Sequence, residues 1–183
     1  MSSRVGPLVK FLDLFLTRVT RGADADHVWR GRLLVAVSLF LSLATLGLAV
    51  ANLVAGEDVP QTSIVISTLA GLGFLLIPVL LRATGAIMTL SWILTLSMLA
   101  AIGSAAWNAY GLYSPGLLAL PIPVLIGLVL GRRRLGVAAA VVAVGMVLGY
   151  YALELRSGWF SEPPLDSANA FLVMSVLFTG IVM

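Results

Sequence analysis

The amino-acid sequence predicts an all-α integral membrane protein, a bundle of six transmembrane helices with its N-terminus in the cytoplasm. Three observations lead to this fold class. Of the 183 residues, 60% are apolar and 10% are charged, whereas soluble domains carry about 25% charged residues. The mean hydropathy is +1.08, and apolar runs of membrane-spanning length recur along the chain. Ten of the 11 lysine and arginine residues fall on alternate connections between these runs.

Residues 1–32 are expected to be a cytoplasmic segment that contains an amphipathic helix. Its apolar positions recur at helical spacing: Leu8, Phe11, Leu12, Phe15, Leu16 and Val19. Such a helix lies in the membrane interface, with its basic residues near anionic lipid headgroups.

Residues 33–183 are expected to form the transmembrane domain. A helix needs about 20 apolar residues to cross the hydrocarbon core. The six spans are predicted at residues 33–54, 63–81, 83–107, 115–130, 135–153 and 168–183. The sixth run has 16 residues and reaches Met183 without a basic anchor. We therefore expect this span to be truncated, and the natural chain to continue into the cytoplasm.

The connecting segments predict the topology. Six basic residues precede the first span, and four arginines act as topology anchors in later connections: Arg82, Arg132, Arg133 and Arg134. The opposite side has only Arg156. Because cytoplasmic loops collect lysine and arginine, the chain is expected to be a multi-pass protein of the cytoplasmic (inner) membrane with its N-terminus inside.

The composition excludes several kinds of chemistry within these residues. The chain has no cysteine and one histidine, His27, and no predicted span has a charged residue near its centre. Proton relays and ion-coupled carriers use intramembrane ionisable groups. We therefore predict no catalytic residues, no metal site and no cofactor here. Nucleic acid is not expected as a partner, because the basic residues lie only between apolar runs.

Three prolines are candidate helix breaks: Pro78, Pro121 and Pro123. A proline inside a helix removes a backbone donor and bends or opens the helix. The functional interpretation is a hinge or a ligand cavity at the break. The simpler interpretation, which we favour, is a kink that improves packing.

Small residues four positions apart mark a candidate helix-packing or dimer face: Gly127, Gly131, Gly145 and Gly149. Such spacing allows two helices to approach closely in lipid. Packing within one bundle is the simpler use. Gly145 and Gly149 are the best candidates for a dimer contact.

An outer connection carries an aromatic cluster with an amide: Trp107, Asn108, Tyr110 and Tyr113. The simpler interpretation is an interfacial aromatic belt. The alternative is the mouth of a ligand pocket.

The stretch from Gly111 to Gly136 resembles the N-terminal six-helix membrane regions of bacterial signalling proteins, namely histidine kinases, diguanylate cyclases and class III adenylyl cyclases. The resemblance lies in a glycine-serine-proline turn before the fourth span, a proline within that span, a glycine-arginine turn, and an alanine-rich fifth span. It implies a sensory module that passes a signal to a cytoplasmic output domain, usually as a dimer.

The chain departs from these families because it contains no phosphoacceptor histidine box, no cyclase signature and no nucleotide-binding glycine motif. Any kinase or cyclase activity would lie in sequence beyond Met183. The first hypothesis is therefore a membrane sensory and anchoring module. The alternative is an accessory or structural membrane subunit, and a small permease ranks third. The expected partners are the lipid bilayer and either a second copy or other membrane subunits; the ligand is unknown.

Overall fold

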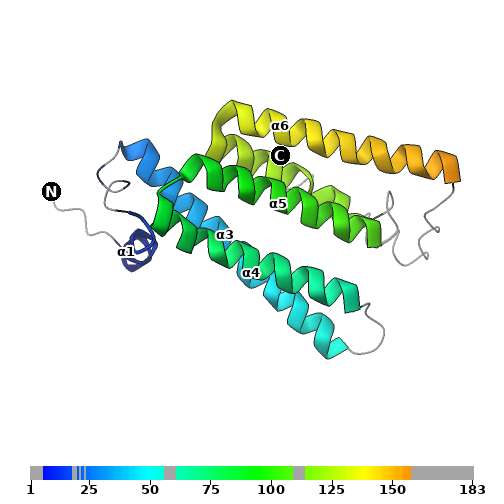
Figure 1. Cartoon of the computed structure of the whole chain (residues 1–183), viewed down its shortest axis with the longest axis horizontal. Coiled ribbons are helices and arrows are strands. Elements are labelled where there is room, and N and C mark those ends of the chain that lie inside the picture. Colours follow the sequence, from blue (N-terminus) through cyan, green and yellow to red (C-terminus); the bar gives the residue numbers. More distant parts are fainter. Residues whose placement is uncertain are drawn as a thin grey trace. The chain divides into compact units, whose positions relative to one another are not determined.

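All regular structure in the described part of the chain is helical. The computed structural model describes residues 6–17, 20, 22, 24–55, 61–108 and 114–157. The elements are shown in Figure 1 and have these bounds: α1 (Pro7–Asp13), α3 (Ala25–Ala55), α4 (Gln61–Thr84), α5 (Ile87–Asn108), the 3₁₀ helix η2 (Pro115–Ala119) and α6 (Pro121–Ser157). The predicted all-α fold class is confirmed for these residues.

Four helical segments in the described residues are long and apolar enough to cross a membrane. They are Ala25–Val54, Ile64–Thr84, Ile87–Trp107 and Gly116–Leu155. Five of the six predicted spans fall on these residues, where the structure has four such segments, so the predicted count of six is not reached in the described part of the chain. The first three segments correspond to the first three predicted spans. The fourth covers the two spans predicted at 115–130 and 135–153, and the span predicted at 168–183 lies outside the described residues.

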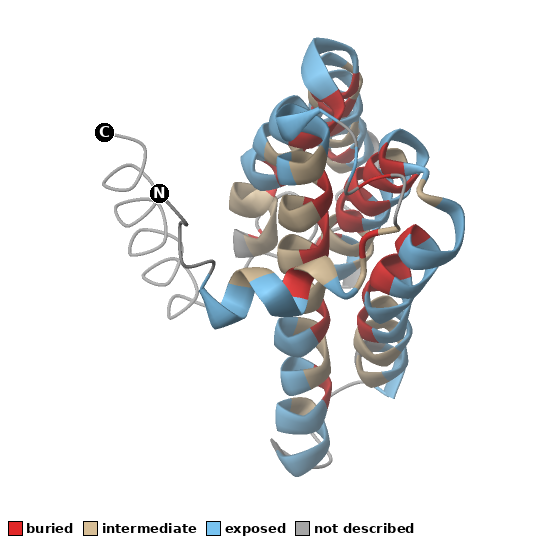
Figure 2. Cartoon of the chain, turned by 90° about the vertical axis from the view of Figure 1, so that its left-hand side faces the viewer, coloured by how far each residue is buried: buried red, intermediate tan, exposed pale blue. Residues whose placement is uncertain are grey.

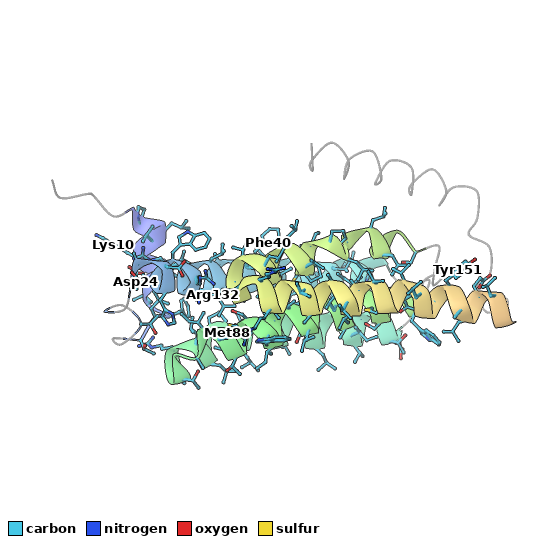
Figure 3. The ribbon with its side chains drawn as sticks, turned by 90° about the horizontal axis from the view of Figure 1, so that it is seen from above. Lys10, Asp24, Phe40, Met88, Arg132 and Tyr151 are labelled. Carbon is cyan, nitrogen blue, oxygen red and sulfur yellow. The ribbon has the colours of Figure 1, made fainter. Side chains whose placement is uncertain are left out.

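α6 covers most of the two spans predicted at 115–130 and 135–153. Its backbone is helical on both sides of Arg132, which alone departs from helical geometry, with φ 62° and ψ −173°. Leu120 nevertheless packs in one cluster with Ala139 and Ala143. A straight helix would hold residues 19 positions apart at a distance of about 28 Å. α6 therefore has a first arm (121–131) and a second arm (133–157) that run antiparallel, and Arg132 lies at the turn between them (Figures 1 and 3).

The chain divides into two compact units. The first is Met1–Leu94 with Val129–Gly131, and the second is Thr95–Leu128 with Arg132–Met183. Figure 2 shows that buried residues follow particular faces of the helices, while much of the remaining helix surface is exposed. In the first unit, the buried core comes from α3, α4 and the start of α5: Leu34, Val35, Phe74, Ile77, Leu81, Leu90 and Leu94.

α3 and α4 approach closely at Gly71. The Ser42 hydroxyl of α3 donates a hydrogen bond to the Gly71 carbonyl oxygen at 2.8 Å. A Cβ atom at Gly71 would lie 2.6 Å from Cγ of Leu46. The absence of a side chain at residue 71 thus allows the helices to meet, and the Ser42 hydroxyl group has a protein partner.

α4 ends at Thr84, directly before Gly85, and not at its one charged residue, Arg82. Gly85 has a φ of 65°, which glycine adopts without steric cost. Its N–H donates to the Leu81 carbonyl oxygen at 2.8 Å, a pattern that closes a helix C-terminus. Arg82 is therefore in the last turn of α4, where its side chain is exposed.

α1 is shorter than the spacing of apolar residues predicts. It ends at Asp13, although Leu16 continues the same pattern and is buried. The Thr17 hydroxyl oxygen accepts a hydrogen bond from the Thr20 N–H at 3.0 Å. Such local side-chain bonds to the backbone compete with helix continuation.

Candidate functional site

Arg32, near the start of α3, forms an ion pair with Asp13 at the end of α1. Its Nε donates to Oδ1 of Asp13 at 2.7 Å, and its Nη2 donates to Oδ2 at 2.9 Å. Paired, charge-assisted bonds of this kind fix the geometry of both groups. Leu12 and Leu16 are buried nearby in the sequence. α1 is thus held by one bidentate ion pair and by its buried Leu12, and Leu16 is buried in the segment that follows α1.

Arg30 connects α3 to the turn of α6. Its Nε donates to Oδ2 of Asp26 at 2.9 Å, one helical turn away. Its Nη1 donates to the Leu130 carbonyl oxygen at 3.2 Å. Leu130 is in the last turn of the first arm, where carbonyl groups lack helical partners and a cation is favourable. Residues 100 positions apart are joined in this way within the first unit.

The predicted topology anchors have different backbone environments. The side chains of Arg133 and Arg134 are exposed on helical residues of α6. Arg132 is the one described non-glycine residue with a positive φ. Its φ and ψ fall in a region that almost only glycine occupies, at a cost of about 1–3 kcal/mol. The chain therefore turns at Arg132, and the positive charges of Arg133 and Arg134 follow directly in helical positions.

The three candidate breaks lie in helices at different positions. Pro78 is buried inside α4, and the helix continues past it. Pro121 is the first residue of α6, a position that proline favours because its N–H would be unpaired there. Pro123 is buried in the first turn of α6. The non-helical residue of α6 is Arg132, so the reversal of the chain occurs at arginine and not at proline.

The predicted glycine face separates into two pairs. Gly127 and Gly131 are buried. A Cβ atom at Gly127 would lie 3.4 Å from side-chain atoms of Leu135 and Thr95, so this residue serves packing within the second unit. Positions that Cβ atoms would occupy at Gly145 and Gly149 have nothing described within 4 Å.

The aromatic cluster is only partly described. Trp107 lies with its ring centroid 6.2 Å from that of Tyr150. Asn108 ends α5, and Tyr110 and Tyr113 lie outside the described residues. The Tyr150 hydroxyl donates to the Gly103 carbonyl oxygen at 2.7 Å. Sequence reasoning missed Tyr150, although a tyrosine pair near the end of an apolar run is a usual sign of an interfacial anchor.

An open apolar groove of about 460 Å³ follows the second arm of α6. η2 and the first arm contribute Leu117, Leu120, Pro121 and Val124, and the second arm contributes Ala140, Ala143, Val144, Val147 and Leu148. Its volume is in the usual range of ligand sites. Because every lining side chain is a hydrocarbon, the groove suits another hydrocarbon surface and offers no side-chain hydrogen bond.

In the parts of the chain that the structure describes, no three histidine, cysteine, aspartate or glutamate side chains gather as metal ligands do. The candidate site is therefore a pair of features, a polar cluster around the start of α3 and an apolar groove on α6. Comparison with known proteins adds no family, since no family model, curated protein or solved structure matches the chain.

Proposed function

We propose that the chain is the membrane-embedded sensory and anchoring module of a bacterial signalling protein, located in the inner membrane. The proposed membrane placement is supported by large apolar side chains that are exposed on the long helices. Phe40 is 71% exposed, Leu43 75% and Leu69 65%. Water would penalise such surface by about 25 cal/mol per Å², whereas lipid tails cover it. Extended exposed apolar surface is typical of a membrane or partner contact.

The charge distribution supports an N-terminus inside. Arg30 and Arg32 are near the start of α3, and Arg82 is in the last turn of α4. The connection between the far ends of these helices has Glu57 and Asp58 and no basic residue. Since lysine and arginine remain on the cytoplasmic side, both ends with arginine belong to that side.

Two polar contacts support a signalling role over passive anchoring. Arg32 fastens α1 to α3, and Arg30 joins α3 to the turn of α6. A change in helix packing would alter these contacts at the side where an output domain would be attached. A ligand or membrane state would act by favouring one of two packings through a difference in affinity. The resemblance of residues 111–136 to membrane sensor regions also supports this role.

Labelling of single cysteines tests the membrane placement, because the native chain has none. We expect an impermeant maleimide to label Gln61→Cys from outside intact cells and to leave Arg133→Cys unlabelled until the cells are opened. The reverse pattern would contradict the proposed topology, and recovery of the chain in the soluble fraction would contradict insertion.

The gene sequence beyond the codon of Met183 tests the signalling role. We expect an in-frame kinase, cyclase or similar output domain. A stop codon directly after Met183 would exclude a covalently attached output domain.

A second candidate function is an accessory subunit of a larger membrane assembly. The observation that favours it is that no described atom lies within 4 Å of a Cβ position at Gly145 or Gly149. A helix of another subunit could approach closely there. Purification from native membranes separates the two functions. Stable co-isolation with unrelated membrane subunits favours the accessory role, and isolation as a single species favours the signalling module.

A further inference from the structure

We infer that α1 lies in the headgroup layer of the cytoplasmic leaflet, and that Leu8, Phe11 and Leu14 contact lipid there. The inference rests on the membrane placement proposed above and does not depend on the signalling role. α1 and the helix ends around it belong to the first unit. The partner is the lipid surface on the side of the membrane to which the arginine-bearing ends of α3 and α4 are assigned.

The apolar residues of α1 and of the segment after it have two different environments. Leu12 and Leu16 are buried, and a Cβ atom at Gly31 of α3 would lie 2.7 Å from Cδ2 of Leu16. Three large apolar residues on the other side of the segment are exposed: Leu8, Phe11 and Leu14. The sequence predicts one apolar face, but the structure has a protein-facing side and an open apolar side, which needs a cover.

The ion pair between Asp13 and Arg32 fixes the depth of α1. Arg32 directly precedes the uncharged run 33–54, so it marks the level at which α3 leaves the hydrocarbon core. Nε of Arg32 lies 2.7 Å from Oδ1 of Asp13, which places the end of α1 at this level. The next residues are held at the arginine-bearing end of α4, since a Cβ atom at Gly85 would lie 3.4 Å from Oγ1 of Thr17.

The axis of α1 runs across the axes of the long helices. Figure 1 shows α1 almost along its axis, whereas α3 and α4 extend across the picture. A helix with this orientation at the edge of the hydrocarbon core stays at one depth over its whole length. Helices that lie in the plane of the interface bury apolar side chains at the boundary between headgroups and acyl chains. The open side of α1 is therefore at the depth of lipid headgroups.

Polar and aromatic residues at the same level fit a cover of anionic lipid. Lys10 is exposed on α1, and a lysine can lay its stem on apolar surface while its ammonium group reaches a phosphate. Trp29 of α3, less than one turn before Arg32, is exposed, and tryptophan is typical of the headgroup level. Residues 1–32 have six basic and three acidic residues, which complements the negative surface of the cytoplasmic leaflet.

Depth-dependent fluorescence quenching in liposomes tests the inference, since the chain has no native cysteine. A nitrobenzoxadiazole probe is attached to Leu8→Cys, Phe11→Cys or Leu14→Cys in three separate variants. Each is reconstituted in phosphatidylcholine with phosphatidylglycerol, and the lipids carry a nitroxide either near the headgroup or near the end of an acyl chain. We expect the shallow nitroxide to quench all three probes several-fold more strongly than the deep one does.

Two exposed residues serve as depth controls. Phe40 and Asp24 are each eight residues from Arg32, on opposite sides of it. They therefore lie about 12 Å inward and about 12 Å outward along the direction of α3. Both are exposed, so each can carry the probe. We expect the deep nitroxide to quench Phe40→Cys most strongly, and neither nitroxide to quench Asp24→Cys.

Two results would overturn the inference while the Phe40→Cys probe responds as expected. Strongest quenching of the α1 probes by the deep nitroxide would place α1 inside the hydrocarbon core. Absence of quenching by either nitroxide would mean that water or another protein covers this side of α1. If one α1 variant does not reconstitute, the other two decide. An unquenched Phe40→Cys probe would instead contradict the membrane placement, and with it the proposed function.

Discussion

The hydroxyl group of Tyr150 donates a 2.7 Å hydrogen bond to the carbonyl oxygen of Gly103, and it thereby joins the second arm of α6 to α5. Gly103 lies against the end of the Met146 side chain, whose Cε would have to move to make room for a Cβ atom at residue 103. Tyr150 is buried, and Ala106 packs with it in one apolar cluster. The bond therefore forms inside the second unit, where little water competes for it.

Tyr150→Phe removes the hydroxyl group and keeps the ring. We expect a loss of about 0.5–1.5 kcal/mol in the free energy of unfolding, the usual value of such a bond. Unfolding of the detergent-solubilised protein by sodium dodecyl sulfate measures it. Tyr151→Phe is the matched control, because Tyr151 is exposed. An equal loss in both variants would mean that the Gly103 bond has no special role.

Gly71→Ala is expected to destabilise the protein by about 1–3 kcal/mol, because the new methyl group meets Leu46 and forces α3 and α4 apart. Gly73→Ala, in the same helix, has nothing within 4 Å of the new atom and should be neutral or stabilising by up to about 1 kcal/mol. Thermal unfolding in detergent compares the two. Similar stabilities would contradict the close approach at residue 71.

Arg132→Gly is expected to stabilise the protein, by about 1 kcal/mol or more, because glycine adopts the backbone conformation of residue 132 without strain. Arg133→Gly removes the same charge from a helical residue and should destabilise by about 1 kcal/mol. The difference between these two variants isolates the backbone effect from the charge. If both lose stability equally, residue 132 has ordinary helical geometry.

Asp13→Asn is expected to release α1 from α3, since Arg32 loses its anionic partner. The measurement is the rate at which a maleimide reacts with Leu12→Cys, which is buried in the native arrangement and should react several-fold faster after release. Asp24→Asn removes the same charge from an exposed residue and should leave the rate unchanged. Restoration of slow labelling by exchange of Asp13 and Arg32 would confirm that the ion pair is responsible.

The long apolar helices could be predicted from the sequence, but their ends could not. The first span was predicted to begin at residue 33, after Arg32, whereas α3 begins at Ala25. Hydropathy marks where lipid-compatible residues begin, and a helix continues through charged residues beyond that boundary. The second span was predicted to end before Arg82, but α4 continues to Thr84 because the backbone of Gly85 ends it.

The reversal within α6 could not be predicted in detail because it depends on one residue's backbone. The sequence indicates a basic connection at residues 131–134, and the structure places the interruption at Arg132, with Arg133 already helical. The Asp13–Arg32 pair was also missed, since residues 19 positions apart carry no local signal of contact. Tyr150 was missed because the aromatic prediction considered only the connection after Trp107.

The contact between Arg30 and Leu130 sets an order of events during biosynthesis. Leu130 is synthesised 100 residues after Arg30, so this bond can form only when most of the described chain has been made. Asp26, one turn from Arg30, is available from the outset and pairs with the same guanidinium group. Arg30 thus has Asp26 as a counter-ion while the later helices are still being synthesised. It donates to the Leu130 carbonyl oxygen only after that residue has been made.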